Sequence, residues 1–128
     1  MSLQEVIICV DDEKVILNSL RTMLVRKLGK EYEFEFAESA EEAFEIIESL
    51  GRNQKLYLII TDWHMPTMKG DEFLSKIKAS YPSIKTIMLS GYADSRAIQV
   101  AKDNLFLDYF LAKPWEEEEL IDLIIDNK

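Results

Sequence analysis

Two kinds of hydrophobic pattern alternate along the chain. Short runs of apolar, β-branched and aromatic residues are typical of strands, and an unbroken apolar run indicates a strand buried on both faces. Such runs occur at residues 6–10, 32–37, 56–61, 84–89 and 109–112. In the second run, aromatic residues alternate with Glu, which predicts a strand with one buried face at the edge of a sheet.

The segments between these runs, and the segment after the last one, have a helical pattern. Apolar residues three or four positions apart predict amphipathic helices there. The first helix is predicted to run from Lys14 to about Gly29, and the second from a Ser39 cap, with Glu42 three residues later, to Gly51. The third is predicted to end at Pro82, the fourth to begin at an Asp94 cap, and the fifth to begin at about Trp115. Their inward-facing residues are predicted to be Ile16, Leu20, Leu24 and Leu28; Ala43, Ile47 and Leu50; Leu74, Ile77 and Tyr81; Ala97, Ala101 and Leu105; and Leu120, Ile121, Ile124 and Ile125.

Strands that alternate with helices in this way predict one α/β domain. The connections are too short for anything but right-handed β-α-β crossovers, so the five strands should form a doubly wound parallel sheet flanked by five helices. The chain of 128 residues is the length of a single domain, which we expect to occupy residues 1–128.

Composition narrows the possible partners and location. The net charge is −9 and no Lys/Arg cluster offsets it locally, so the domain should bind neither nucleic acid nor an anionic membrane. Cys9 is the only cysteine, which excludes a disulfide within the chain, and its apolar surroundings predict a buried thiol. No apolar stretch is long enough to span a membrane and no signal-like segment is present, so we expect a cytoplasmic protein.

Charged and polar residues stand where four of the strands are predicted to end. Asp11 and Asp12 follow the first strand, Asp62 the third, Ser90 the fourth and Lys113 the fifth. Because the carboxyl ends of parallel strands meet at one side of the sheet, these side chains should lie together. Two like charges about 5 Å apart at an effective dielectric of about 20 repel by about 3 kcal/mol, so clustered carboxylates need a cation.

The residue types indicate which ions such a site binds. Carboxylate oxygens suit Mg²⁺ or Mn²⁺, and the single histidine leaves no basis for a zinc site. Ser90 and Lys113 add a hydroxyl donor and an ammonium group, which can hold an anion such as a phosphoryl group beside the metal. These residues also have purely structural explanations: Asp11 and Asp12 as helix caps, Ser90 as a turn residue and Lys113 as a solvated strand end. Pro66 and Gly70 predict a loop after Asp62.

Four motifs in order give the chain a resemblance to a known family. These are VDDE at residues 10–13, TDWHMP at 61–66, LSGYAD at 89–94 and KP at 113–114. Over nearly its whole length the chain resembles a response regulator receiver domain of two-component signalling. The resemblance implies a flavodoxin-like sheet with strand order 2-1-3-4-5.

The same resemblance implies a role for each acid. Asp62 would accept a phosphoryl group from a histidine kinase or a phosphotransfer protein. Asp12, Asp62 and the backbone carbonyl of His64 would bind Mg²⁺ directly, with Asp11 acting mainly through water. A carboxylate can serve as the nucleophile because phosphoryl transfer depends on positioning and charge neutralisation. The domain would thereby catalyse its own phosphorylation and dephosphorylation without being an enzyme of the usual kind.

A conformational switch is also implied. Ser90 and Lys113 would each contact a phosphoryl oxygen, and the movement of Ser90 would alter the surface formed by residues 94–104 and 109–115. This surface would control an output domain, an effector protein or a phosphorylation-dependent homodimer. Phe110 stands where the family usually has a switch aromatic, often Tyr; a core aromatic is an equal interpretation.

Two bulky residues, His64 and Tyr92, flank the expected phosphoryl group and are predicted to prolong its lifetime by excluding water. Two other classes of function remain open at this point. A small Mg²⁺-dependent phosphatase or phosphotransferase would share the nucleophile and metal but need a substrate pocket. A flavodoxin-like cofactor carrier would need a phosphate-binding loop where the acidic residues 11–13 stand.

Overall fold

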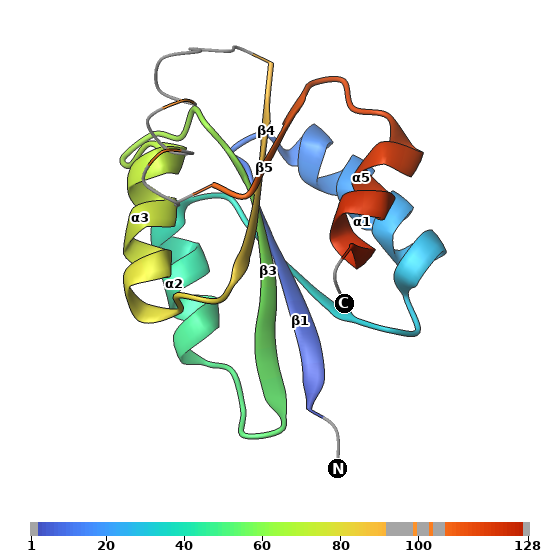
Figure 1. Cartoon of the computed structure of the whole chain (residues 1–128), viewed down its shortest axis with the longest axis vertical. Coiled ribbons are helices and arrows are strands. Elements are labelled where there is room, and N and C mark those ends of the chain that lie inside the picture. Colours follow the sequence, from blue (N-terminus) through green and yellow to red (C-terminus); the bar gives the residue numbers. More distant parts are fainter. Residues whose placement is uncertain (1–2, 92–98, 100–102, 104–106, 127–128) are drawn as a thin grey trace.

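The computed structural model describes residues 3–91, 99, 103 and 107–126 (Figure 1). Its strands are β1 (Gln4–Val10), β2 (Glu33–Ala37), β3 (Gln54–Asp62), β4 (Lys85–Ser90) and β5 (Tyr109–Ala112). Its helices are α1 (Lys14–Leu28), α2 (Ala40–Glu48), α3 (Gly70–Ser80) and α5 (Glu117–Ile125). The helix predicted from Asp94, with Ala97, Ala101 and Leu105 inward, lies outside the described residues apart from Gln99 and Asp103.

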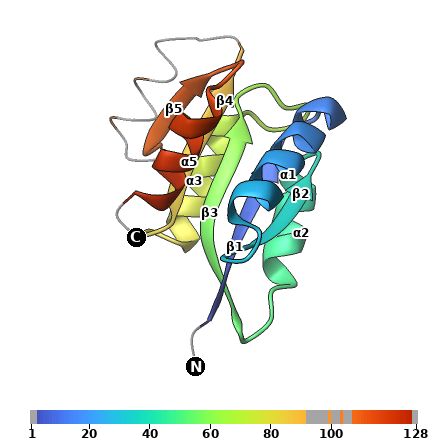
Figure 2. The same ribbon diagram turned by 90° about the vertical axis from the view of Figure 1, so that its right-hand side faces the viewer.

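The five strands form one parallel sheet in the order β2-β1-β3-β4-β5, as predicted. Helices α2 and α3 cover one face, and α1 and α5 cover the other (Figures 1 and 2). Strand β2 lies at a lateral edge, which agrees with its alternating pattern. None of the helices in the described ranges is long and apolar enough to cross a membrane.

Two apolar layers pack against the sheet, and β1 contributes to both. Val6, Ile8 and Val10 face the α2–α3 side, whereas Ile7 and Cys9 face the α1–α5 side. All five are buried, and burying one aliphatic side chain of this size contributes about 2 kcal/mol. Burial also raises the pKa of the Cys9 thiol well above its usual range, so Cys9 is the inert core residue that the sequence predicts.

The beginning of α2 confirms the predicted Ser39 cap. The Ser39 Oγ atom accepts a hydrogen bond from the Glu42 main-chain N–H at 3.1 Å. The Glu42 carboxylate accepts a hydrogen bond at 2.7 Å from the N–H of Glu38, the residue before the cap. In the usual capping box this side chain accepts from the N–H of the cap residue itself.

Several predicted boundaries and orientations are wrong. Tyr81 and Ile125 are 40% and 43% exposed instead of facing inward. Tyr81 follows the end of α3 with a non-helical backbone, so the helical periodicity no longer directs its side chain. Ile125 is the last residue of α5, next to the exposed cap residue Asp126. Gly70 begins α3 instead of lying in the loop. Helix α5 begins at Glu117, close to the predicted start at about Trp115.

Candidate functional site

Asp62 is the last residue of β3, the central strand, which pairs with β1 on one side and β4 on the other. Its side chain is buried, and one carboxylate oxygen, Oδ1, accepts a hydrogen bond from the Trp63 N–H at 2.8 Å. The other oxygen, Oδ2, lies 3.5 Å from the ammonium nitrogen of Lys113. The strand therefore ends on a carboxylate held between a main-chain donor and a cation.

Asp11 follows β1 directly and lies beside the same lysine. Its Oδ2 atom accepts a hydrogen bond from Lys113 Nζ at 2.7 Å, and its Oδ1 atom accepts from the Glu13 N–H at 2.9 Å. Asp11 is as deeply buried as Asp62, so Lys113 bridges two buried carboxylates from different strands. The predicted meeting of strand ends is present for β1, β3 and β5.

Four acidic side chains gather at this end of the sheet. Carboxylate oxygens of Asp11, Asp12, Glu13 and Asp62 lie within 4.8 Å of one another. Asp12 and Glu13 are exposed, whereas the other two are buried. Oxygen ligands of this kind fit Mg²⁺ or Mn²⁺, and their mutual repulsion favours binding of such an ion. Glu13 was not among the predicted metal ligands, although it is the third of three consecutive acids after a strand.

The pKa values of Asp62 and Lys113 are both raised, but for different reasons. Burial raises the pKa of Asp62, the Asp11 carboxylate raises it further, and Lys113 only partly opposes this. Burial alone would lower the pKa of Lys113, but the hydrogen bond and charge of Asp11, together with Asp62, raise it above its usual range. A cation at the acids would favour the ionised form of Asp62.

Ser90 completes the set of predicted strand-end residues. It is the last residue of β4 and is 2% exposed. Its carbonyl oxygen accepts a hydrogen bond from the Lys113 N–H at 3.0 Å. Strand β4 pairs Leu89 with Asp62 on β3, so Ser90 stands one residue beyond that pair, on the strand between Asp62 and Lys113.

Gly70 closes the loop that follows Asp62. Its N–H donates to the Trp63 carbonyl at 2.9 Å, and a Cβ at this position would collide with the carbonyl oxygen of Asp62. Only glycine allows this close approach. Gly70 was predicted as a loop glycine, but its contact with the backbone of Asp62 could not be predicted because it depends on the path of the loop.

The remaining predicted site residues lie either outside the acidic cluster or outside the described residues. His64 is exposed, and its ring lies edge-on to that of Trp63 with centroids 6.4 Å apart. Phe110 is half-buried and packs against the apolar layer on the α2–α3 side. Tyr92 and most of residues 94–104 lie outside the described residues.

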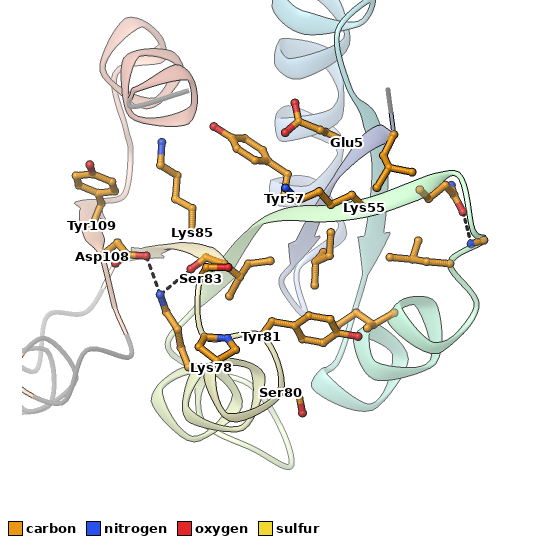
Figure 3. Close-up of a pocket in the computed structure, with 18 of the residues that line it drawn as sticks. Glu5, Lys55, Tyr57, Lys78, Ser80, Tyr81, Ser83, Lys85, Asp108 and Tyr109 are labelled. Atoms are coloured by element: carbon orange, nitrogen blue, oxygen red, sulfur yellow. Dashed lines mark hydrogen bonds and ion pairs between the residues drawn. The ribbon is translucent and has the colours of Figure 1, made fainter. Parts of the chain in front are cut away.

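A groove of about 1240 Å³ opens at the opposite, amino end of the sheet (Figure 3). Tyr57, Tyr81 and Lys85 are among its lining residues. None of the clustered acids lines it, so this groove is separate from the candidate site.

The geometry thus defines a parallel α/β domain with an acidic site for a divalent cation and, beside it, a serine and a lysine suited to an anion. A family model for the response regulator receiver domain matches residues 7–125, and the chain belongs to this family.

Individual relatives agree with this assignment. The chain is 32% identical to the hydrogenase transcriptional regulatory protein HoxA of Cupriavidus necator over 94% of its own length and 23% of the relative's. A CheY-like receiver domain protein from Methanospirillum hungatei superimposes with a TM-score of 0.80 at 32% identity, covering 96% of this chain and 91% of the other. The signal receiver domain of an HD domain-containing protein from Pseudomonas fluorescens gives 0.84 at 30% identity, covering 94% and 91%. The chain spans about a quarter of the length of the first curated relatives it matches.

Proposed function

We propose that this receiver domain accepts a phosphoryl group on Asp62, in a Mg²⁺-dependent reaction, from the phosphohistidine of a histidine kinase or phosphotransfer protein. The observation that carries the proposal is the buried Asp62 carboxylate at the end of β3, held beside Asp11 and Lys113. The receiver family provides the class of donor. We expect the reaction to take place in the cytoplasm.

In the proposed reaction an Asp62 oxygen forms a bond to phosphorus. The bond between phosphorus and the donor imidazole nitrogen breaks, and its electron pair stays on that nitrogen. Asp12, Asp62 and the His64 carbonyl would hold Mg²⁺ directly, with Asp11 acting mainly through water, and the bound ion would supply charge neutralisation for the acids and the phosphoryl oxygens. Lys113, which already reaches Asp62, pairs with a phosphoryl oxygen, and the Ser90 hydroxyl donates a hydrogen bond to another.

The proposed output is a change of surface. Contacts of Ser90 and Lys113 with the phosphoryl group exist only in the phosphorylated state, so they can shift the domain toward a second conformation. The affected surface would include β5 with Phe110, and its partner would be an output domain, an effector protein or a second copy of the domain. His64 and Tyr92 would set the lifetime of the phosphorylated state.

The test uses the intact chain with Mg²⁺ and acetyl phosphate as donor. Intact-mass spectrometry should show a gain of one phosphoryl group, which Asp62→Asn and chelation of Mg²⁺ should each abolish. Asp122→Asn removes an exposed acid of α5 and serves as the matched control that keeps the gain. An unchanged gain in Asp62→Asn would remove Asp62 from the proposed role.

A further inference from the structure

Asp108 lies immediately before β5, at the amino end of the sheet. Its Oδ2 atom accepts hydrogen bonds from the Thr86 N–H at 2.9 Å and from the Thr86 hydroxyl at 3.2 Å. The Asp108 N–H donates in return to Thr86 Oγ1 at 3.0 Å and to the Thr86 carbonyl at 3.2 Å. Thr86 is fully buried in β4, so this reciprocal pair attaches the start of β5 to a fixed point of the sheet.

A lysine from α3 adds a third element to this pair. Lys78 Nζ lies 3.1 Å from the same Asp108 oxygen and donates to the Ile84 carbonyl at 2.6 Å (Figure 3). The Lys78 side chain is only 15% exposed. The end of α3, the start of β4 and the residue that precedes β5 are therefore joined by one group of hydrogen bonds.

Strand β5 needs such an attachment because its own pairing is short. It has four residues, pairs only with β4, and runs in register from Ile87–Tyr109 to Ser90–Ala112. Leu111 is its only buried residue. A slip of one residue would turn every side chain of the strand to the opposite face, and a single buried position specifies the register weakly. The Asp108–Thr86 pair extends the ladder by one residue at its start.

The register of β5 decides where Lys113 lies. Lys113 follows β5 directly, its N–H donates to the Ser90 carbonyl, and its ammonium group reaches Asp11 and Asp62. Lys113 lies five positions after Asp108, a span of about 17 Å along an extended strand. We propose that Asp108 is a positioning residue for phosphoryl transfer, holding β5 in the register that brings the Lys113 ammonium group to Asp62.

This inference rests on the proposed function, but it makes a separable prediction. The acids that would hold the metal follow β1 and end β3, so they do not depend on the register of β5. Loss of the Asp108 contacts should therefore weaken the action of Lys113 on phosphoryl transfer without weakening the affinity for Mg²⁺.

The first experiment compares Asp108→Ala with the matched surface variant Asp122→Asn. Asp108→Ala should slow phosphorylation by acetyl phosphate by about tenfold, since small displacements of a charge-neutralising group are costly. Its Mg²⁺ dissociation constant, measured by calorimetry, should be no higher than that of wild type. Asp108→Asn, whose amide oxygen can still accept from Thr86, should recover most of the rate. If the alanine variant folds poorly, the asparagine variant provides the comparison with wild type instead.

A double variant separates positioning from a general loss of stability. In a Lys113→Met background, Asp108→Ala should cause no further loss of rate, because it acts through the lysine. Two losses that simply multiply would overturn the proposal, as would a weakened Mg²⁺ affinity in Asp108→Ala.

Amide hydrogen exchange tests the register without any phosphoryl donor. Exchange at Leu111 and Lys113 should accelerate in Asp108→Ala and stay at the wild-type rate in Asp122→Asn. If wild type accepts no phosphoryl group, the proposed function fails while this measurement still reports on β5. Equal exchange in Asp108→Ala and wild type would show that Asp108 does not hold the strand.

Discussion

At the carboxyl end of the sheet, Asp11 and Asp62 share the single ammonium group of Lys113, whereas at the amino end the ammonium group of Lys85 binds three carbonyl oxygens. The carbonyls belong to the last residues of α5 and its cap, with Nζ–O distances of 2.6, 3.3 and 2.6 Å. The carboxyl end of the sheet therefore keeps an excess of negative charge, whereas at the amino end the Lys85 ammonium group finds its hydrogen-bond acceptors within the fold.

The neighbours of Lys85 reinforce this contrast. The Tyr57 hydroxyl donates to the Ile124 carbonyl at 2.6 Å, and the Tyr109 hydroxyl lies 3.0 Å from a carboxylate oxygen of Asp126. The Lys85 ammonium also lies within 6 Å of both tyrosine rings. Helix α5 has no basic residue in its last turn, so a lysine from β4 supplies the cation that its C-terminal dipole favours.

The two ends of the sheet therefore differ in their capacity to bind ions. Charges with complete sets of partners stabilise a structure, whereas an incompletely neutralised cluster costs stability and can bind a cation and an anion. The same substitution, Lys to Met, can be made at both ends, and it should separate the two roles.

The largest expected effect concerns phosphorylation. Lys113→Met should slow phosphorylation by acetyl phosphate by about a hundredfold or more, equivalent to about 2.7 kcal/mol of barrier. Lys85→Met should leave the rate within about twofold, because its contacts lie at the far end of the sheet. Stopped reactions analysed by intact mass would measure both rates. Equal losses in the two variants would mean that the ends of the sheet are not functionally distinct.

The next effect concerns stability. Lys85→Met should lower the free energy of unfolding by about 2 kcal/mol, since it leaves carbonyls at the end of α5 without their charged donor. Lys55→Met, which changes an exposed lysine lining the same groove, should cost less than about 0.5 kcal/mol. Urea unfolding would compare the two variants, and similar losses in both would show that the α5 contacts contribute little.

The two ends also differ in how much the sequence could predict. Asp11, Asp62, Ser90 and Lys113 could be placed together because each ends or follows a strand, and parallel strands bring their carboxyl ends to one side. Topology alone was sufficient. The doubly wound fold and its strand positions were predictable for the same reason, since periodicity and alternation are local features of the chain.

The contacts at the amino end could not be predicted in this way. Lys85 reaches Leu123, 38 positions later, and Asp108 reaches Thr86, 22 positions earlier. Both contacts depend on how closely α5 and the start of β5 approach β4. No repeat or motif in the sequence predicts that distance. The path that brings Gly70 against the backbone of Asp62 was hidden for the same reason.

A smaller effect, at the carboxyl end of the sheet, is a dependence of stability on pH. Burial and the Asp11 carboxylate raise the pKa of Asp62, so the folded chain favours its protonated form more than the unfolded chain does. For an acid with a raised pKa, the stabilising contribution is present below the ordinary pKa of 3.8 and is lost as pH rises through the folded-state pKa. In the absence of Mg²⁺, the ionised Asp62 should therefore reduce stability at neutral pH.

Asp62→Asn removes that charge and keeps an oxygen that can accept from the Trp63 N–H. It should raise the free energy of unfolding at neutral pH by about 1 kcal/mol, a fraction of the full repulsion because Lys113 offsets part of it. The gain over wild type should shrink as the pH falls toward the ordinary Asp pKa of 3.8, because Asp62, whose pKa is raised in the folded chain, is protonated before that value is reached. Urea unfolding with a chelator at both pH values, with Asp122→Asn as the exposed control, would measure this. A variant less stable than wild type at neutral pH would mean that Lys113 neutralises the acids fully and that the two ends of the sheet do not differ in this respect.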